Sequence, residues 1–152
     1  MGVLLTQRKQ TLATAESCTG GRIASRLTAI SGASTYFRGS VVSYATSLKK
    51  SLLGVSESSI EKHSVVSAEV AEEMALGAQR QLQADYTIAT TGNAGPNKGE
   101  SEEEIGTIFI AIASPSGVTV EKFNFGLHRE KTLQKTVNKA LELLRIEILK
   151  NP

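Results

Sequence analysis

The segment LATAESCTGGRIASRL, residues 12–27, decides the fold because it joins an apolar strand to an amphipathic helix through a glycine-rich turn. Residues 11–15 predict a short β-strand that ends just before the turn at residues 16–21. The apolar residues that then recur at helical spacing are Ile23, Ala24, Leu27 and Ile30. Strands followed by helices build α/β proteins, whose binding sites lie at the carboxyl ends of the strands. The segment therefore predicts an α/β fold with a candidate site in this turn.

The rest of the chain continues the alternation of strands and helices. Segments rich in β-branched and aromatic residues predict four more strands, at residues 36–45, 85–92, 106–114 and 118–126. Apolar periodicity predicts helices at residues 2–10, 47–54, 67–82 and 128–150, with Thr46 and Ser67 as N-caps. Only Pro-Ser-Gly separates the last two strands, so we expect an antiparallel hairpin there. Together these elements predict a mixed sheet that helices cover on both faces.

Two of the helices show apolar stripes that predict their buried faces. The stripe of the 67–82 helix consists of Val70, Ala71, Met74, Ala78 and Leu82. The stripe of the last helix consists of Leu133, Val137, Ala140, Leu141 and Leu144. We expect both helices to pack their stripes on the sheet.

Composition narrows the class of protein. A length of 152 residues with 40% hydrophobic content suits one domain, residues 1–152. The net charge of +2 is dispersed, which favours a small-molecule ligand over nucleic acid or a membrane surface. No apolar run approaches the ~20 residues of a membrane span, and the N-terminus lacks the pattern of a signal peptide, so we expect a cytoplasmic protein. A single cysteine and two distant histidines predict neither a disulfide nor a metal site.

The turn AESCTGG, residues 15–21, allows two interpretations of Ser17. Serine is an ordinary helix N-cap, and the local pattern alone favours that role. A serine beside unpaired helix amides can also act as a nucleophile, because those amides stabilise negative charge on a carbonyl oxygen. Cys18 is a competing nucleophile, since helix N-termini lower the pKa of thiols. Without a histidine nearby, we rank Cys18 below Ser17.

The second connection, VVSYATSLKK at residues 41–50, offers a base for such a serine. A neutral lysine can replace the histidine of a catalytic triad when its pKa falls from about 10.4 toward 7 or 8. Lys49 or Lys50 is the candidate, and the positive end of the helix dipole disfavours the charged form of Lys49. The local pattern alone favours the interpretation that both lysines are solvated helix residues. Tyr44 either bridges the serine and the lysine or packs its ring.

The third connection, TTGNAGPNKGESEEEIG at residues 90–106, is rich in groups that bind phosphate or ribose. Threonine hydroxyls, the Asn93 amide and the exposed backbone N–H groups of a glycine-rich turn supply these groups. The Walker pattern is absent, so nothing supports nucleoside-triphosphate hydrolysis. We interpret the acidic run at residues 100–104 as a solvated surface.

Four blocks in this order resemble the CinA C-terminal domain family over nearly the whole chain. They are TAESCTGG at 14–21, GSVVSYATSLKKSLLGV at 39–55, VSAEVAEEMA at 66–75 and TTGNAGP at 90–96. The resemblance implies a three-layer α/β/α sandwich with a mixed, mostly parallel five-stranded sheet. Characterised members include amidases that convert nicotinamide mononucleotide to nicotinate mononucleotide and ammonia. The resemblance therefore implies a Ser/Lys amidohydrolase of pyridine nucleotide salvage that needs neither a cofactor nor a metal.

The resemblance also assigns roles to residues. It implies Ser17 as nucleophile, Lys49 rather than Lys50 as general base, and Tyr44 as a supporting hydroxyl. Arg129 is the expected phosphate ligand. The full set of expected substrate-binding residues is Glu16, Thr19, Gly20, Gly21, Thr91, Gly92, Asn93, Ala94, Gly95 and Arg129.

Two segments depart from the family pattern. The family usually continues after AGP with Asp, two Gly and a Thr, where this chain has NKGESEEEIG, and GLHRE replaces a Gly-Asp-Arg type sequence. The departures leave two alternatives, a nucleotide-binding or regulatory module without catalysis and an amidase for another carboxamide. Larger members carry a further N-terminal domain, whereas this chain contains only the amidase-like part. We expect a homo-oligomer, with a dimer favoured.

Overall fold

The computed structural model describes residues 1–152 and contains one five-stranded sheet in the order β2-β1-β3-β4-β5. The strands are β1 (Leu12–Glu16), β2 (Phe37–Val42), β3 (Tyr86–Gly92), β4 (Thr107–Ser114) and β5 (Gly117–Asn124). β2 and β3 both pair with β1 in parallel, whereas β4 pairs antiparallel with β3 and with β5. Only β4 therefore runs against the others. The expected mixed, mostly parallel sheet and its C-terminal hairpin are confirmed.

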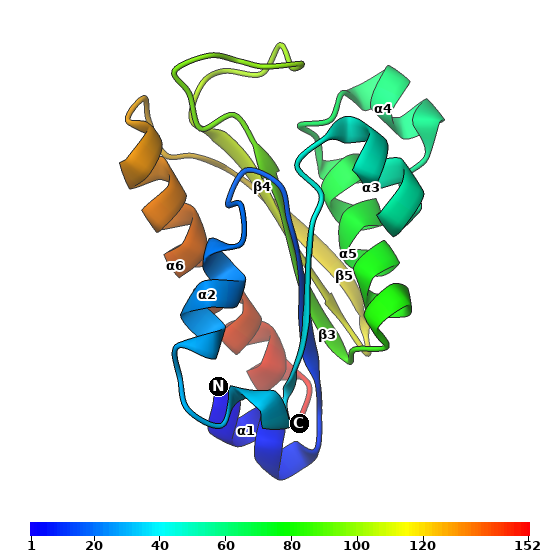
Figure 1. Cartoon of the computed structure of the whole chain (residues 1–152), viewed down its shortest axis with the longest axis vertical. Coiled ribbons are helices and arrows are strands. Elements are labelled where there is room, and N and C mark those ends of the chain that lie inside the picture. Colours follow the sequence, from blue (N-terminus) through cyan, green and yellow to red (C-terminus); the bar gives the residue numbers. More distant parts are fainter.

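Helices cover both faces of this sheet (Figure 1). One face carries α1 (Gly2–Arg8), α2 (Arg22–Thr28) and α6 (Arg129–Lys150), with the short 3-10 helix η1 (Ala33–Thr35) nearby. The other face carries α5 (Ala68–Leu82), beside which lie α3 (Thr46–Leu53) and α4 (Glu57–His63). The three-layer α/β/α sandwich is thereby confirmed. None of the helices combines the length and the apolar composition that crossing a membrane requires.

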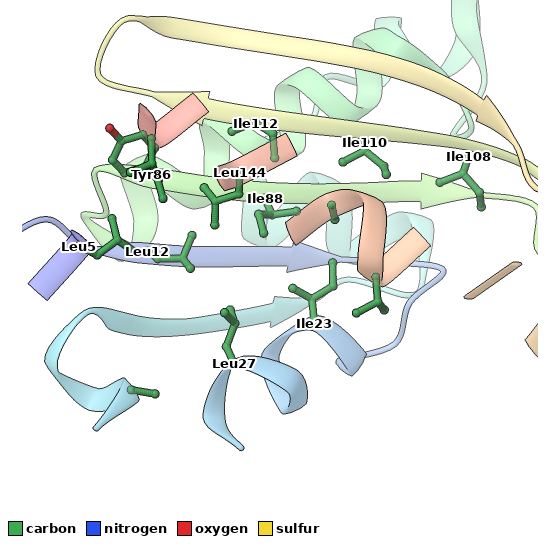
Figure 2. Packing of buried hydrophobic residues seen from close by; sticks show 14 of the residues in the cluster. Leu5, Leu12, Ile23, Leu27, Tyr86, Ile88, Ile108, Ile110, Ile112 and Leu144 are labelled. Carbon is green, nitrogen blue, oxygen red and sulfur yellow. The ribbon is translucent and has the colours of Figure 1, made fainter. Parts of the chain in front are cut away.

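The sequence of β4 explains why the two layers of helices pack differently. Because side chains alternate along a strand, Ile108, Ile110 and Ile112 point to the α6 face, where Figure 2 shows them together with Ile88 and Leu144. The opposite face of β4 carries Phe109, Ala111 and Ala113, which pack with α5. Two alanines in this row leave room for α5 to lie close to the sheet.

On that second face, α3 and α5 pack with their backbones in contact. A Cβ built on Gly77 of α5 would overlap the carbonyl oxygen of Leu53, the last residue of α3. No side chain fits between the two backbones there, so only glycine permits this packing. Gly77 therefore fixes how closely α3 lies against α5.

Several local predictions need correction. α2 ends at Thr28, so Ile30 lies beyond the helix and is 63% exposed. Leu82 and Leu141 are only half-buried at the margins of their stripes. The N-cap of α3 is Ala45 rather than Thr46, whereas Ser67 caps α5 as predicted, accepting from the Val70 N–H at 3.3 Å.

Helix α4 was not predicted at all. It has no buried residue and therefore lacks the apolar periodicity by which a helix is recognised in sequence.

Candidate active site

The three connections that the sequence singled out meet at one edge of the sheet, at the carboxyl ends of β1, β2 and β3, the upper edge in Figure 1. They surround a cavity of about 610 Å³. Val65 and Val66 from the segment before α5, and Arg129 from α6, complete its wall. The lining residues from the connections are Ser17, Cys18, Tyr44, Ala45, Thr46, Ser47, Lys49, Thr91, Gly92, Asn93, Ala94, Asn97, Lys98, Gly99 and Glu100.

A larger and more open cavity of about 1020 Å³ lies between α4 and the acidic run at residues 100–104. It contains none of the predicted site residues, so we place the candidate active site in the smaller cavity.

Ser17 is the first residue after β1 and is held by main-chain hydrogen bonds. Its N–H donates to the Thr90 carbonyl at 3.1 Å, and its carbonyl accepts from the Gly20 N–H at 3.0 Å. Only 8% of the residue is exposed. The hydroxyl is thus presented to the cavity from a fixed backbone.

Lys49 is buried and lies against the Ser17 hydroxyl. Its Nζ is 3.0 Å from Ser17 Oγ and donates to the carbonyls of Ser43 at 2.8 Å and Tyr44 at 3.4 Å. A neutral amine has two N–H groups and one lone pair, and carbonyl oxygens only accept. When Lys49 is neutral, its two N–H groups can donate to the carbonyls while the lone pair faces Ser17. The arrangement is therefore suited to taking the proton of the Ser17 hydroxyl.

Burial is the main influence on the pKa of Lys49. It lowers the pKa of Lys49 from its usual value of 10.5, while the charge of Glu100 raises it to a smaller extent. From the sequence we predicted that the helix dipole lowers the pKa of Lys49. In the structure, the largest cause of the lowering is desolvation by burial. Lys50 instead points to solvent, 3.4 Å from Glu57, and does not reach Ser17.

Glu16 has a different role from the predicted one, which is a correction. Its side chain is fully buried, and its carboxylate accepts from Thr19 Oγ1 at 2.6 Å and from the N–H groups of Ile23 at 3.0 Å and Ala24 at 2.9 Å. Those N–H groups belong to the first turn of α2, whose N-cap is Gly21 at φ 95°. Glu16 therefore caps α2, and neither Glu16 nor Thr19 lines the cavity.

This capping overturns both roles that we predicted for the start of α2. Ser17 is not the N-cap, and the helix amides predicted to hold an oxyanion already bind Glu16. Gly20 and Gly21 form the turn at positive φ and also lie outside the cavity lining. Two other N–H groups, those of Cys18 and Ala94, belong to residues that line the cavity and donate to no main-chain carbonyl.

The third connection contributes Thr91, Gly92, Asn93 and Ala94 to the cavity, as expected for substrate-binding residues. Gly95, also predicted to bind substrate, is not among the lining residues, and its carbonyl instead accepts from Arg129 Nη1 at 2.6 Å. The placement of the other four agrees with a ligand site, whose contacts stay a prediction.

Tyr44 contacts Lys49 only through its main-chain carbonyl. The residue is 62% exposed, and its hydroxyl accepts from Arg129 Nη2 at 3.3 Å rather than meeting Ser17 or Lys49. The predicted supporting hydroxyl is therefore placed next to Arg129. A guanidinium has five N–H donors, so Arg129 keeps donors for a ligand at the rim of the cavity.

Cys18 is unsuited to the alternative role of nucleophile. Burial raises the pKa of its thiol from 9.0 to about 12, against a smaller lowering from the hydrogen bond to Thr90. The thiolate is the reactive form, so the thiol is inert near neutral pH. Nowhere in the chain do three or more His, Cys, Asp or Glu side chains gather as metal ligands.

Sequence reasoning missed two contributors. The Ser43 carbonyl binds Lys49, but any residue supplies a carbonyl, so no residue type could signal it. Glu100 belongs to the acidic run that we interpreted as solvated, yet its Oε2 accepts from Thr46 Oγ1 at 2.6 Å and it lines the cavity.

Comparison with known proteins places these features in a family. Residues 1–148 match the family model described as the CinA C-terminal domain. The chain is 58% identical over 151 residues to a CinA-like protein of Flavobacterium psychrophilum and 44% identical over 151 residues to one of Desulfotalea psychrophila. Each match covers 99% of this chain, which spans only 36% and 37% of the length of these relatives.

Solved structures agree with this assignment. A crystal structure of a competence-damaged protein (CinA) superfamily protein from Klebsiella pneumoniae has a TM-score of 0.93 at 30% identity, covering 97% of this chain and 92% of that one. A competence/damage inducible protein from Agrobacterium tumefaciens has a TM-score of 0.90 at 35% identity, covering 95% and 88%. The match in sequence and the shared fold show that this chain belongs to the CinA C-terminal domain family.

Proposed function

We propose that this chain is a Ser/Lys amidohydrolase that converts nicotinamide mononucleotide to nicotinate mononucleotide and ammonia. The observation that carries the proposal is the 3.0 Å separation of Lys49 Nζ and Ser17 Oγ at a cavity with Arg129 at its rim. A buried amine with a lowered pKa is a competent base for a serine nucleophile.

In the first half-reaction, the serine replaces the amide nitrogen. Neutral Lys49 takes the hydroxyl proton while Ser17 Oγ forms a bond to the carboxamide carbon, and the carbonyl electron pair moves to oxygen. The C–N bond then breaks, its electron pair stays on nitrogen, and Lys49 returns the proton to it. Ammonia leaves, and an ester to Ser17 remains.

In the second half-reaction, water cleaves the ester. Lys49, neutral again, takes a proton from water as the oxygen bonds to the acyl carbon. The bond to Ser17 Oγ breaks, and Lys49 gives its proton to that oxygen. Nicotinate mononucleotide is released, and the hydroxyl of Ser17 is restored.

The negative charge on the carbonyl oxygen needs N–H donors that no main-chain carbonyl already binds. The N–H groups of Cys18 and Ala94 meet this condition and belong to residues on the cavity wall, so we assign them to the oxyanion. Arg129, with guanidinium donors to spare, is assigned to the phosphate of the substrate.

The test is ammonia release from nicotinamide mononucleotide by the purified protein. Replacing Ser17 by Ala should lower the rate by at least about 10³-fold, since the nucleophile is lost. Ser51→Ala is the matched control, because Ser51 is an exposed serine of α3 outside the cavity, and it should keep the wild-type rate. Ammonia release that survives Ser17→Ala removes the proposed mechanism.

A second candidate is a nucleotide-binding module of this family without catalysis. The observation in its favour is the altered loop after Pro96, from which Lys98 and Glu100 line the cavity. Saturable binding of pyridine nucleotides without ammonia release would establish it. The same assay over a panel of carboxamides would reveal an amidase for another amide.

A further inference from the structure

One side chain on the cavity wall has an unused acceptor. Asn93 is only 7% exposed and lines the cavity that contains Ser17 and Lys49. Its Nδ2 donates to the Glu103 carbonyl at 2.9 Å, whereas its Oδ1 accepts no hydrogen bond from the chain and is not among the side-chain atoms closed off from solvent. Because Nδ2 is already paired and Oδ1 still reaches solvent, Oδ1 is an acceptor that remains available to a ligand in this cavity.

The orientation of this amide is determined by chemistry. The two ends of an asparagine amide are distinguished by their partners, and the Glu103 carbonyl can only accept. Nδ2 must therefore be the atom that faces Glu103, and Oδ1 must be the atom left over.

The backbone holds Asn93 equally firmly. Its N–H donates to the Thr107 carbonyl at 2.9 Å, and its carbonyl accepts from the Gly106 N–H at 2.6 Å. The Glu103 side chain lies 3.2 Å from Lys122 Nζ of β5, which steadies the loop that supplies the Glu103 carbonyl. The oxygen is thus a preorganised acceptor rather than a mobile surface group.

We propose that Asn93 Oδ1 accepts an N–H from the substrate's carboxamide and thereby makes the site specific for primary amides. This inference rests on the proposed amidase function and adds a specificity-determining residue to it. A primary amide brings two N–H donors on the nitrogen that leaves. A carboxylate or an ester brings none at that position, so its oxygen would face the Oδ1 lone pairs.

The same contact has a consequence for turnover. The carboxylate product of amide hydrolysis has no donor for Oδ1, so the site favours the substrate over its own product. A site that is built to hydrogen-bond one group rejects the analogue that lacks it, because a buried polar atom is then left unpaired.

The first test compares an amide and an ester that differ only at the leaving group. Wild type, Asn93→Ala and Asn138→Ala are assayed with nicotinamide mononucleotide and with the methyl ester of nicotinate mononucleotide. Asn138 is an exposed asparagine of α6 outside this cavity and is the matched control. We expect Asn93→Ala to lower kcat/KM for the amide by about 10- to 100-fold and for the ester by less than about 3-fold.

The split between the two substrates separates recognition from folding. A loop that merely loosens when Nδ2 is lost lowers both activities together, and an equal fall for amide and ester would overturn the proposal. An unchanged amide rate in Asn93→Ala would overturn it as well.

A binding measurement keeps the inference independent of catalysis. Calorimetry measures the affinities of the Ser17→Ala protein for nicotinamide mononucleotide and for nicotinate mononucleotide. The same affinities are then measured for the double variant that also carries Asn93→Ala. We expect the preference for the amide over the carboxylate to fall by at least about 10-fold in the double variant. If the preference falls although the wild type releases no ammonia, the amidase proposal fails and the Asn93 inference stands. If it does not change, the Asn93 inference is wrong.

Discussion

Lys49 Nζ lies 3.0 Å from Ser17 Oγ, although the two residues are 32 positions apart in the chain. The register of the parallel pair β1 and β2 creates this contact, because Glu16 pairs with Val42 and the next residues leave the two strands side by side. The Ser43 N–H then donates to the Glu16 carbonyl at 2.9 Å. One strand end thus presents the hydroxyl, and its neighbour starts the turn into the helix that presents the amine.

Replacing Lys49 by Met should abolish hydrolysis while the protein still folds. Methionine fills a similar volume but cannot take a proton, and loss of a general base costs about 10²- to 10⁴-fold in rate. Ammonia release and the thermal unfolding transition measure the two effects. Lys50→Met removes the neighbouring solvent-exposed lysine and should leave the rate unchanged; an equal loss in both variants would contradict the assignment of the base.

The rate should rise with pH along a limb that belongs to Lys49. Only the neutral amine takes a proton, and burial lowers the pKa of Lys49 below 10.5, so this limb lies at a lower pH than for a free lysine. The charge of Glu100 raises that pKa, so Glu100→Gln should move the limb to lower pH. The pH profile of kcat/KM measures the shift, and Glu102→Gln, an exposed neighbour, should not move it.

The same lysine should make stability depend on pH. Its folded-state pKa lies below the value of the unfolded chain, so the unfolded state binds the proton more tightly. The free energy of unfolding should therefore rise as the pH rises from the folded-state pKa toward 10.5. Urea unfolding across this range should show the rise in wild type and a flatter dependence in Lys49→Met.

Glu16→Ala should destabilise the fold although Glu16 does not face the cavity. The substitution leaves the Thr19 hydroxyl and two α2 amides without their acceptor, which costs about 2–4 kcal/mol by the usual penalty for a lost cap and unpaired buried groups. Urea unfolding measures the loss. Glu130→Ala removes an exposed partner of Arg22 instead and should cost less than about 1 kcal/mol.

Cys18 should be dispensable for catalysis and slow to alkylate. Its thiol is buried with a pKa of about 12, so iodoacetamide should label it at pH 7 only when urea unfolds the chain. Cys18→Ala should keep most of the activity, since its N–H belongs to the backbone and remains. Rapid labelling of the folded protein, or loss of activity in Cys18→Ala, would contradict this view.

The sequence predicted the α/β sandwich because each strand and most helices carry a periodic pattern that local chemistry sets. Helix α4 escaped prediction because it buries no residue, and the end of α2 was misplaced because Ile30 continues the apolar pattern after the helix stops. Such departures depend on tertiary packing, which a local pattern does not contain.

The family motifs predicted which residues form the candidate site. They did not predict the direction in which each side chain points. Ser17 and Lys49 were identified by the motif and come together in the structure. Glu16 and Tyr44 belong to the same motifs, yet one points into the protein and the other toward Arg129. The sequence shows which side chain is present, but the orientation of that side chain depends on the hydrogen-bond partners that the folded chain places around it. The expected homo-oligomer stays a prediction.

The contact between Gly77 and Leu53 also bears on the chemistry, although it lies outside the cavity. Lys49 belongs to α3, and the backbones of α3 and α5 are in contact because Gly77 has no side chain. A single methyl group at Gly77 would push the helix outward and draw the amine away from the hydroxyl. The separation of Lys49 Nζ and Ser17 Oγ thus depends on the lack of a side chain at Gly77 of α5, and it can change although no residue of the candidate site is substituted.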